Sequence, residues 1–338
     1  MGRYFKATVL TGAGGPEKLV LQEFPLPEPG KGEARVRVIA CGLGSTEVGT
    51  MRRGAYPFAP KVPFIPGYDI VGLVEALGKD AIGLEIGQRV ACLAVFGGFG
   101  EVLVRRVEEF VPVPDGLDAA EVVALVLNYV TAWQMIDGVA RPKAGEFALV
   151  TGANGGVGTA LLELLHLRGV RVIGAASAAH RDLVESYGAR WIESRGAPVS
   201  EGVRRIVPEG VDVAFDAIGG RGALDCLRST RRGGRLVGYG WMGTAKDGHV
   251  STALTLMTLW TILVRAPLSG RRGTFYGITG LYRADSKPFR EDLSRLLEML
   301  ARGEIKPRLA ARLPLLEARR GIEMLEMGGI EGKIVLLA

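Results

Sequence analysis

Short apolar runs, separated by glycine and proline, dominate the first part of the chain. The clearest are Ala7–Leu10, Ala34–Ile39, Ile70–Val74 and Arg89–Leu93. Apolar runs of this length between turn-forming residues are typical of β-strands. The pattern therefore predicts a β-rich domain over roughly the first 120 residues.

The pattern changes near Ala119, where longer helical segments begin, and after Glu146 apolar strands alternate with helical stretches. Such alternation is typical of βαβ units, which build a parallel sheet whose strands are buried on both faces. The sequence therefore predicts an α/β domain with a doubly wound parallel sheet. Its predicted strands are Phe147–Thr151, Val170–Ala175, Val211–Ala217 and Arg235–Tyr239.

Two further elements are predicted near the end of the chain. Apolar residues recur at helical spacing over Arg290–Arg302, and Gly303 follows where a helix C-cap is expected. Lys333–Leu337 is predicted as a final strand. The apolar stretch Leu254–Val264 is shorter than the roughly 20 residues that a membrane helix needs, so a buried helix or a subunit contact is predicted there.

Composition changes this picture little. The 338 residues, 48% hydrophobic and 23% charged, suit an ordinary globular protein of two domains. The net charge of +6 comes from scattered basic pairs such as Arg231-Arg232, which indicates a solvated surface and no nucleic-acid partner. The N-terminus lacks the pattern of a secretory signal, and no membrane partner is expected.

The three cysteines, Cys41, Cys92 and Cys226, lie far apart in the sequence. They form no Cys-x-x-Cys pair, so neither a disulfide framework nor a zinc ribbon is indicated. A reducing cytoplasm fits this pattern.

The segment Thr151–Gly158 carries the strongest chemical signal. Its glycines at 152, 155, 156 and 158 follow a predicted strand and precede a predicted helix. This order places backbone N–H groups and a helix N-terminus against a pyrophosphate. Glycine-rich turns also occur as plain loops, but the strand before and the helix after favour a dinucleotide-binding site.

The end of the second predicted strand bears on the choice between NADH and NADPH. An acidic residue there would hydrogen-bond the ribose 2′-hydroxyl and repel a 2′-phosphate. The strand instead ends at Ala176-Ser177, and Arg181 follows in a position to bind a phosphate by two charge-assisted hydrogen bonds. The alternative is that Arg181 is a solvated helix residue beside Asp182. NADPH is the predicted cofactor.

Six motifs occur in order along nearly the whole chain. They are Cys41–Glu47, Arg53–Pro57, Pro63–Gly72, Gly87–Val90, Gly97–Glu101 and Asn128–Trp133. Together they resemble the zinc-free quinone oxidoreductases of the medium-chain dehydrogenase/reductase superfamily. The resemblance implies a GroES-like catalytic domain over 1–127 and 284–338, around a Rossmann cofactor domain over 128–283, and it implies a homodimer.

The resemblance also assigns cofactor contacts to residues of this chain. They are Thr131 at the carboxamide; Ala153, Asn154, Gly155, Gly156, Val157 and Gly158 at the pyrophosphate; Ser177, Arg181 and Arg195 at the 2′-phosphate; Ala217, Ile218, Tyr239 and Gly240 along the ribose and nicotinamide; and Lys333 in a tail that closes over the cofactor. The position of Ser194 is often a tyrosine in these enzymes.

The zinc alcohol dehydrogenases of the same superfamily hold a catalytic metal with Cys, His and Cys or Asp side chains at three of these motifs. The corresponding positions resemble Gly44, Tyr68 and approximately Leu127, and none of these residues is a soft metal ligand. A catalytic zinc needs about three protein ligands. The resemblance therefore predicts an enzyme without a metal.

Without a metal to polarise a carbonyl, the acceptor must already be electron-poor. Quinones and α,β-unsaturated carbonyls meet this condition, so the predicted activity is NADPH-dependent reduction of a quinone or an enone. Tyr56 is the candidate proton donor by resemblance, and the alternative is a structural aromatic at a Tyr-Pro turn. Two other functions remain open: an enoyl-thioester reductase, and an NADPH-binding structural or regulatory protein without turnover.

Overall fold

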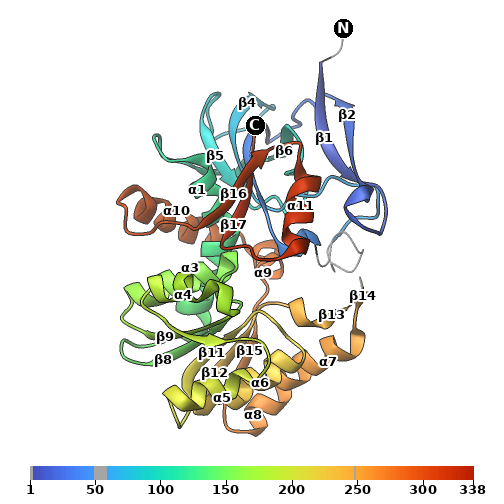
Figure 1. Cartoon of the computed structure of the whole chain (residues 1–338). Coiled ribbons are helices and arrows are strands. Elements are labelled where there is room, and N and C mark those ends of the chain that lie inside the picture. Colours follow the sequence, from blue (N-terminus) through green and yellow to red (C-terminus); the bar gives the residue numbers. More distant parts are fainter. Residues whose placement is uncertain (1–2, 49–58, 247–248) are drawn as a thin grey trace. The chain divides into compact units, whose positions relative to one another are not determined.

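The computed structural model describes residues 3–48, 59–246 and 249–338, and the chain folds into two compact units (Figure 1). The discontinuous unit comprises Met1–Val130 and Leu281–Ala338, and the central unit comprises Thr131–Gly280. The sequence places the domain boundaries at 127/128 and 283/284, and this assignment of functional domains remains a proposal.

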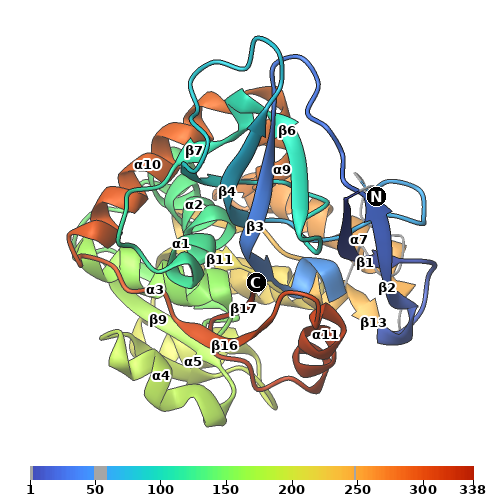
Figure 2. The same ribbon diagram turned by 90° about the horizontal axis from the view of Figure 1, so that it is seen from above.

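Within the described residues, the discontinuous unit is built on a seven-stranded sheet in the order β16-β17-β3-β4-β5-β7, with β6 also paired to β3. The last strand, β17, pairs antiparallel with β3 and parallel with β16, so both sequence segments of this unit contribute strands to one sheet (Figure 2). A separate hairpin, β1-β2, lies at its side. The strand bounds are β1 Tyr4–Leu10, β2 Leu19–Pro25, β3 Glu33–Leu43, β4 Ile70–Leu77, β5 Arg89–Cys92, β6 Val102–Arg106, β7 Val111–Pro112, β16 Leu309–Pro314 and β17 Lys333–Leu337.

The apolar runs of the sequence explain these strands. The four predicted runs coincide with β1, β3, β4 and β5, although Leu93 follows the end of β5, and the predicted final strand is β17. Their inward residues form one core, in which Val36, Ile70, Val90 and Ile334 have no exposed surface. The prediction of a β-rich domain is therefore confirmed.

The central unit contains a six-stranded, wholly parallel sheet in the order β10-β9-β8-β11-β12-β15. This is the order of a doubly wound nucleotide-binding fold, and the predicted fold class is confirmed. Strands buried on both faces must be almost continuously apolar, as in β8 and β9. The bounds are β8 Phe147–Thr151, β9 Arg171–Ala176, β10 Arg190–Glu193, β11 Val211–Asp216, β12 Thr230–Gly238 and β15 Arg272–Phe275. A small hairpin joins β13 Ala245–Lys246 to β14 His249–Val250.

One predicted strand, Arg235–Tyr239, begins too late in the sequence. The observed strand β12 starts at Thr230, and its register against β11 shifts between the pairs Val211↔Thr230 and Val213↔Arg235. The shifted segment contains Gly233 and Gly234, and Gly233 has φ +75°. Glycine pairs are turn signals in a sequence, and here they form an irregularity inside a strand.

The helices follow the strands in both units. Their bounds are α1 Ala119–Ala124, α2 Val130–Trp133, α3 Gly156–Leu167, α4 Arg181–Ser186, α5 Val199–Ile206, α6 Arg221–Ser229, α7 Thr252–Trp260, α8 Ala266–Leu268, α9 Ile278–Ala284, α10 Lys287–Ala301 and α11 Ala318–Met327. Further helical turns are Pro16–Lys18, Val107–Glu109, Leu125–Tyr129, Gln134–Ala140, Ala178–His180, Met242–Thr244 and Thr261–Arg265. Helix α10 confirms the predicted helix near the C-terminus, and Gly303 follows it with φ +68°.

The apolar stretch Leu254–Val264 lies in α7 and the turn that follows, which pack on α6 (Figure 1). Ile262 is fully buried, but Trp260 and Leu263 are about half exposed and Leu268 is 82% exposed. The prediction of a buried helix is therefore wrong for one face of the segment, since apolar composition alone does not tell which face finds a partner. The predicted subunit contact remains a prediction.

Among the described residues, one helix, Ala119–Ala140, is long and apolar enough to cross a membrane by length and composition alone. Of the most apolar 18-residue segment of this helix, 67% is buried inside the protein. A core helix of a globular protein meets the same criterion. The helix is therefore only weak evidence for a membrane span.

Candidate functional site

The carboxyl ends of the parallel strands gather most of the predicted cofactor residues along one edge of the central sheet. Strand β8 leads into the glycine loop, β9 into Ser177, β11 into Ala217 and β12 into Tyr239. Ligands of doubly wound sheets bind at this edge, where the loops of neighbouring strands meet. The structure therefore places side by side the cofactor-binding residues that the sequence predicted in four separate segments.

The glycine loop closes tightly against the helix that follows it. Gly152 has φ +63°, a conformation that glycine adopts at no steric cost. A Cβ on Gly158 would lie 2.2 Å from the carbonyl oxygen of Gly152 and 2.8 Å from Cα of Ala153. The fully buried Ala153 donates its N–H to the carbonyl of Ala175 at 3.2 Å. Gly158 thus permits the close packing of helix and loop.

The start of α3 is left open to an anion. Gly155 is the N-cap, with an extended backbone and no side chain that caps the helix. The hydroxyl of Thr159 donates to the carbonyls of Gly155 and Gly156, both at 3.1 Å, and does not cover the first N–H groups. These N–H groups have no partners within a helix and, with its dipole, form a site for phosphate.

A buried carboxylate shapes the loop after β11. Asp216 has no exposed surface and accepts hydrogen bonds from the N–H groups of Ile218 and Gly219, both at 3.0 Å. The hydroxyl of Thr151 bridges to this carboxylate and accepts the N–H of Ala217 at 3.1 Å. Sequence reasoning missed Asp216, although an acid at the end of an otherwise apolar strand was a visible signal.

Gly240 is held against the same loop. A Cβ there would lie 2.2 Å from the carbonyl oxygen of Ala217. The neighbouring Tyr239 has a buried hydroxyl without a partner among the described residues. Burial, and then the Asp216 carboxylate, raise the pKa of this hydroxyl. Tyr239 therefore stays protonated.

Thr131 offers a polar group that no described residue satisfies. Its side chain is 5% exposed, and its hydroxyl lacks a hydrogen-bond partner within the described part of the chain. Buried polar groups are rarely left unpaired unless they meet a ligand or water. The open helix start, the glycine loop and this hydroxyl together fit a bound dinucleotide.

The residues predicted for the 2′-phosphate have other partners in the structure. Arg181 is 58% exposed and pairs with Glu185 one turn along α4, with Nε 2.9 Å from Oε1. Its guanidinium also stands 5.3 Å from the centroid of the Trp191 ring. Arg195 is exposed and donates its backbone N–H to Glu193 at 2.9 Å. Their contact with a phosphate remains a proposal.

Lys333 lies in the discontinuous unit and forms a buried ion pair with Asp69. Its Nζ is 2.9 Å from Oδ2 and 3.2 Å from Oδ1, and the two side chains are 3% and 0% exposed. Gly42 leaves the room for this pair, because a Cβ there would lie 2.3 Å from Cε of Lys333. Burial raises the pKa of Asp69, and the Lys333 ammonium opposes that rise. Sequence reasoning assigned Lys333 to the cofactor and missed Asp69 as its partner.

A second buried carboxyl, Glu47, lies near this pair. One oxygen accepts the N–H of Gly44 at 3.0 Å, and the other has no partner among the described residues. Burial raises the pKa of Glu47 from 4.5 to about 7, while Lys333 opposes the rise and Asp69 adds to it. Glu47 is therefore a buried acid that titrates near neutral pH.

The positions that resemble zinc ligands do not fit a metal. Gly44 has no side-chain donor, Tyr68 and Leu127 are buried, and no group of three or more His, Cys, Asp or Glu side chains among the described residues could hold an ion. Cys41 is buried, and burial raises the pKa of its thiol well above the usual value. A cysteine binds zinc as its thiolate, which this burial disfavours.

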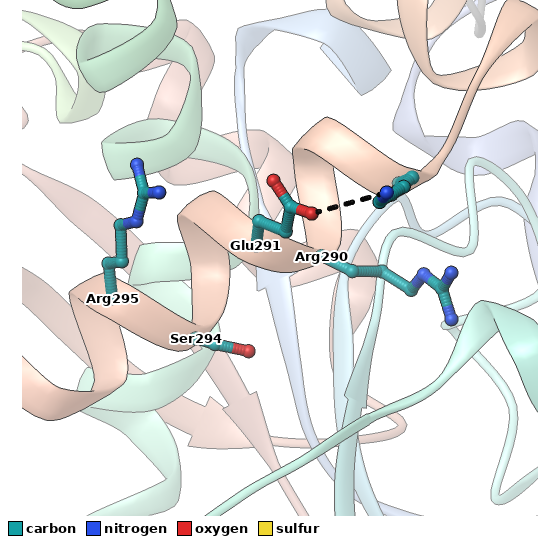
Figure 3. A pocket seen from close by; sticks show the side chains of 5 residues that line it. Arg290, Glu291, Ser294 and Arg295 are labelled. Carbon is teal, nitrogen blue, oxygen red and sulfur yellow. Dashed lines mark ion pairs between the residues drawn. The ribbon is translucent and has the colours of Figure 1, made fainter.

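One predicted site residue lies outside the described part of the chain, and one surface hollow does not form a binding site. Tyr56, the candidate proton donor, lies outside the described residues. A shallow hollow on α10 is lined by Lys287, Arg290, Glu291, Ser294 and Arg295. Figure 3 shows the labelled side chains pointing apart along the helix, with one ion pair between Lys287 and Glu291 at 3.9 Å. Side chains that do not converge do not form a binding site.

Two protein families match the chain. Residues 30–115 match the alcohol dehydrogenase GroES-like domain, and residues 156–286 match the family described as zinc-binding dehydrogenase.

Relatives and solved structures agree with these matches. The mouse quinone oxidoreductase is 30% identical over 333 residues, which cover 96% of this chain and 95% of that protein. The mouse synaptic vesicle membrane protein VAT-1 homolog-like is 37% identical over 216 residues, 64% of this chain and 51% of that protein. The match thus spans about half the length of that relative. The mycobacterial protein Rv1454c in complex with NADPH superposes with a TM-score of 0.85 at 25% identity, covering 99% of this chain and 100% of that one.

Proposed function

We propose that this chain is an NADPH-dependent reductase of quinones or α,β-unsaturated carbonyls. The chain belongs to the quinone oxidoreductase family of the medium-chain dehydrogenase/reductase superfamily. The observation that carries the proposal is the glycine loop packed on the uncapped start of α3. The NADPH complex of the mycobacterial neighbour supports the choice of cofactor.

In this proposal the residues of the central unit bind and orient the cofactor. The first N–H groups of α3 and the loop Gly152–Gly158 hold the pyrophosphate. The unpartnered hydroxyl of Thr131 binds the carboxamide. Asp216 fixes the loop that contains Ala217 and Ile218, and this loop contacts the ribose and nicotinamide of the cofactor. When bound, NADPH supplies a hydride.

The class of hydride acceptor follows from the side chains at the three positions that resemble zinc ligands of the alcohol dehydrogenases. Because Gly44, Tyr68 and Leu127 offer no set of metal ligands, these described positions supply no Lewis acid that would polarise an ordinary ketone. An electron-poor quinone or enone accepts a hydride without such help. With NADPH bound, the protein would hold the hydride donor close to the acceptor and exclude water.

Turnover with three acceptors tests the proposal. NADPH oxidation is measured with a quinone, an enone and an enoyl thioester. We expect turnover with the quinone or the enone. Turnover confined to the thioester would instead make the chain an enoyl-thioester reductase, and NADPH binding without turnover of any acceptor would make it a binding protein.

Tyr56→Phe tests the proposed proton donor. If water can deliver the proton to a delocalised anion, the variant should lower turnover by roughly tenfold, about 1.4 kcal/mol, and leave NADPH affinity unchanged. An obligatory acid would lose about 10²–10⁴-fold, with a larger loss for enoyl thioesters than for quinones. Unchanged turnover with every accepted substrate would assign Tyr56 to the Tyr-Pro turn alone.

The metal content of the purified protein should be far below one zinc per chain, and chelators should leave turnover intact. The reason is that Gly44 and Tyr68 do not provide the side-chain ligands that a zinc ion needs. Elemental analysis after dialysis measures the content. One tightly held zinc per chain would contradict the prediction.

Assembly and location complete the proposal. A homodimer follows from the resemblance, and the exposed apolar residues Trp260, Leu263 and Leu268 are a surface that a second copy could cover. The cysteines Cys41, Cys92 and Cys226 are all free and buried, which suits a reducing compartment such as the cytoplasm.

A further inference from the structure

We propose that Trp191 strengthens the preference of this chain for NADPH by orienting Arg181 toward the 2′-phosphate; the inference rests on the proposed function. Trp191 lies in β10, beside β9, and its indole N–H donates to the carbonyl of Ala176 at 3.1 Å. Ala176 is the last residue of β9. The ring is therefore fixed at the end of the second strand of the nucleotide-binding fold, where the adenosine ribose of a dinucleotide lies.

The guanidinium of Arg181 is held by two neighbours. Its Cζ stands 5.3 Å from the centroid of the Trp191 ring, within the range of a cation–π interaction. Its Nε donates to Oε1 of Glu185 at 2.9 Å, one turn along α4. Arg181 is 58% exposed, so each contact by itself is weak. Together they restrict the conformations of a long side chain that would otherwise move freely in water.

These two contacts leave the end of the guanidinium available. No described residue accepts a hydrogen bond from Nη1 or Nη2 of Arg181. These nitrogens form a planar fork that can donate two parallel, charge-assisted hydrogen bonds to one phosphate. Arg181 can therefore bind the 2′-phosphate of NADPH while it keeps both Trp191 and Glu185. The ribose 2′-hydroxyl of NADH carries no charge and gains less from this guanidinium.

The acid at this edge, Glu193, is occupied by backbone groups. Its Oε2 accepts the N–H of Ala178 at 3.0 Å, and its Oε1 accepts the N–H groups of Ser194 at 2.8 Å and Arg195 at 2.9 Å. Three backbone donors offset part of its negative charge. The same bonds tie the turn after β9 to the residues after β10, so Arg195 adds a second positive charge at this edge.

Trp191→Leu tests the proposal by equilibrium binding. The variant removes the aromatic face under Arg181 and keeps an apolar side chain. At low ionic strength the Kd of NADPH should rise about fivefold, the factor that one cation–π contact supports, while the Kd of NADH should change less than about twofold. Fluorescence titration of the reduced nicotinamide measures both constants. The difference between the cofactors should shrink in high salt, because the phosphate contact is ionic.

Two further variants separate positioning from direct contact. Trp191→Phe keeps an aromatic face and should retain most of the NADPH preference. Arg181→Met removes the charge and should raise the Kd of NADPH by roughly tenfold or more. Adding Trp191→Leu to Arg181→Met should raise it no further, because Trp191 acts through Arg181. A ring that stacks directly on adenine would instead weaken the binding of both cofactors, also in the Arg181→Met background.

A second cation–aromatic pair in the same sheet provides the matched control. The Cζ of Arg171 stands 3.9 Å from the centroid of the Phe147 ring, and the two residues begin β9 and β8. This pair lies at the amino ends of the strands, whereas the predicted cofactor residues lie at the carboxyl ends. Phe147→Leu and Arg171→Met should therefore leave the Kd of both cofactors unchanged.

Competition by cofactor fragments isolates the adenosine end of the site. Against NADPH on the wild-type protein, adenosine 2′,5′-bisphosphate should compete at a lower concentration than adenosine 5′-phosphate, because only the bisphosphate carries the 2′-phosphate. Trp191→Leu should narrow this difference by the same factor by which it narrows the difference between NADPH and NADH.

The outcomes separate this inference from the proposed function. Equal shifts of both cofactors in Trp191→Leu, an undiminished NADPH preference, or a further loss in the double variant would each overturn the role of Trp191 while the reductase proposal stands. The expected binding shifts without turnover of any acceptor would overturn the reductase proposal alone. Failure of the wild type to bind NADPH would overturn both.

Discussion

Replacing Lys333 by methionine should lower the free energy of unfolding by about 3–5 kcal/mol at neutral pH. The substitution leaves the carboxylate of Asp69 without its partner, and that side chain has no exposed surface. An uncompensated buried charge is far more costly than the loss of the pair itself. Denaturant unfolding at pH 7 measures the difference.

Two further variants give this prediction its controls. The double variant Lys333→Met with Asp69→Asn removes both charges and should recover at least half of the loss, because no charge remains buried. Arg308→Ala breaks the nearby pair with Glu331, whose side chains are 50% and 27% exposed, and should change stability by less than about 1 kcal/mol. A loss in the double variant as large as in Lys333→Met would show that packing, and not charge, dominates at this site.

Glu47→Gln should remove a pH dependence of stability that the wild-type protein shows between about pH 5 and pH 7. The pKa of Glu47 is raised from 4.5 to about 7 by burial. Between these values the folded state binds the proton more tightly than the unfolded state does. The stabilisation is therefore complete below the unfolded pKa and is lost as the pH rises through the folded pKa.

The size of this effect follows from the shift. A rise of about 2.5 pKa units corresponds to about 3 kcal/mol lost by pH 8. Glu47→Gln should therefore match the wild type at pH 4.5 and exceed its stability by up to that amount at pH 8. The amide oxygen can still accept the N–H of Gly44.

The measurement is the difference between the wild-type and variant unfolding free energies across pH 4.5–8.5. Subtraction removes the contributions of the other titrating groups. Glu85→Gln, at an exposed side chain of the same unit, should give a flat difference. A flat difference for Glu47→Gln would show that its pKa is not raised. Because Lys333 opposes the shift, Lys333→Met should move the midpoint to higher pH.

The proposed site owes its polar surroundings to contacts that cross between neighbouring strands. Thr151 at the end of β8 reaches Asp216 at the end of β11, and Glu193 at the end of β10 reaches Ala178 after β9. Each contact places a charged or polar side chain at the same edge of the sheet. This edge of the central sheet therefore presents polar and charged groups in fixed positions, as a polar ligand requires.

The elements whose signals are local could be predicted from the sequence. Strands β8 and β17 have the predicted bounds, and the glycine-rich segment Gly152–Gly158 joins a strand to the start of a helix as predicted. Apolar runs, helical spacing and glycine turns act over a few residues, so they can be read without knowing which elements become neighbours.

The contacts between distant segments could not be predicted from the sequence and depend on how the whole chain packs. Lys333 meets Asp69 across 264 positions in the sequence. Glu193 reaches Ala178 because β10 pairs with β9. The order of strands in a sheet cannot be predicted from the sequence of any single strand. The partner of a buried charge is chosen by the packing of the whole chain, because desolvation makes an unpaired charge too unfavourable to leave alone. For this reason the glycine loop was visible in the sequence, whereas the pairing of Lys333 with Asp69 was not.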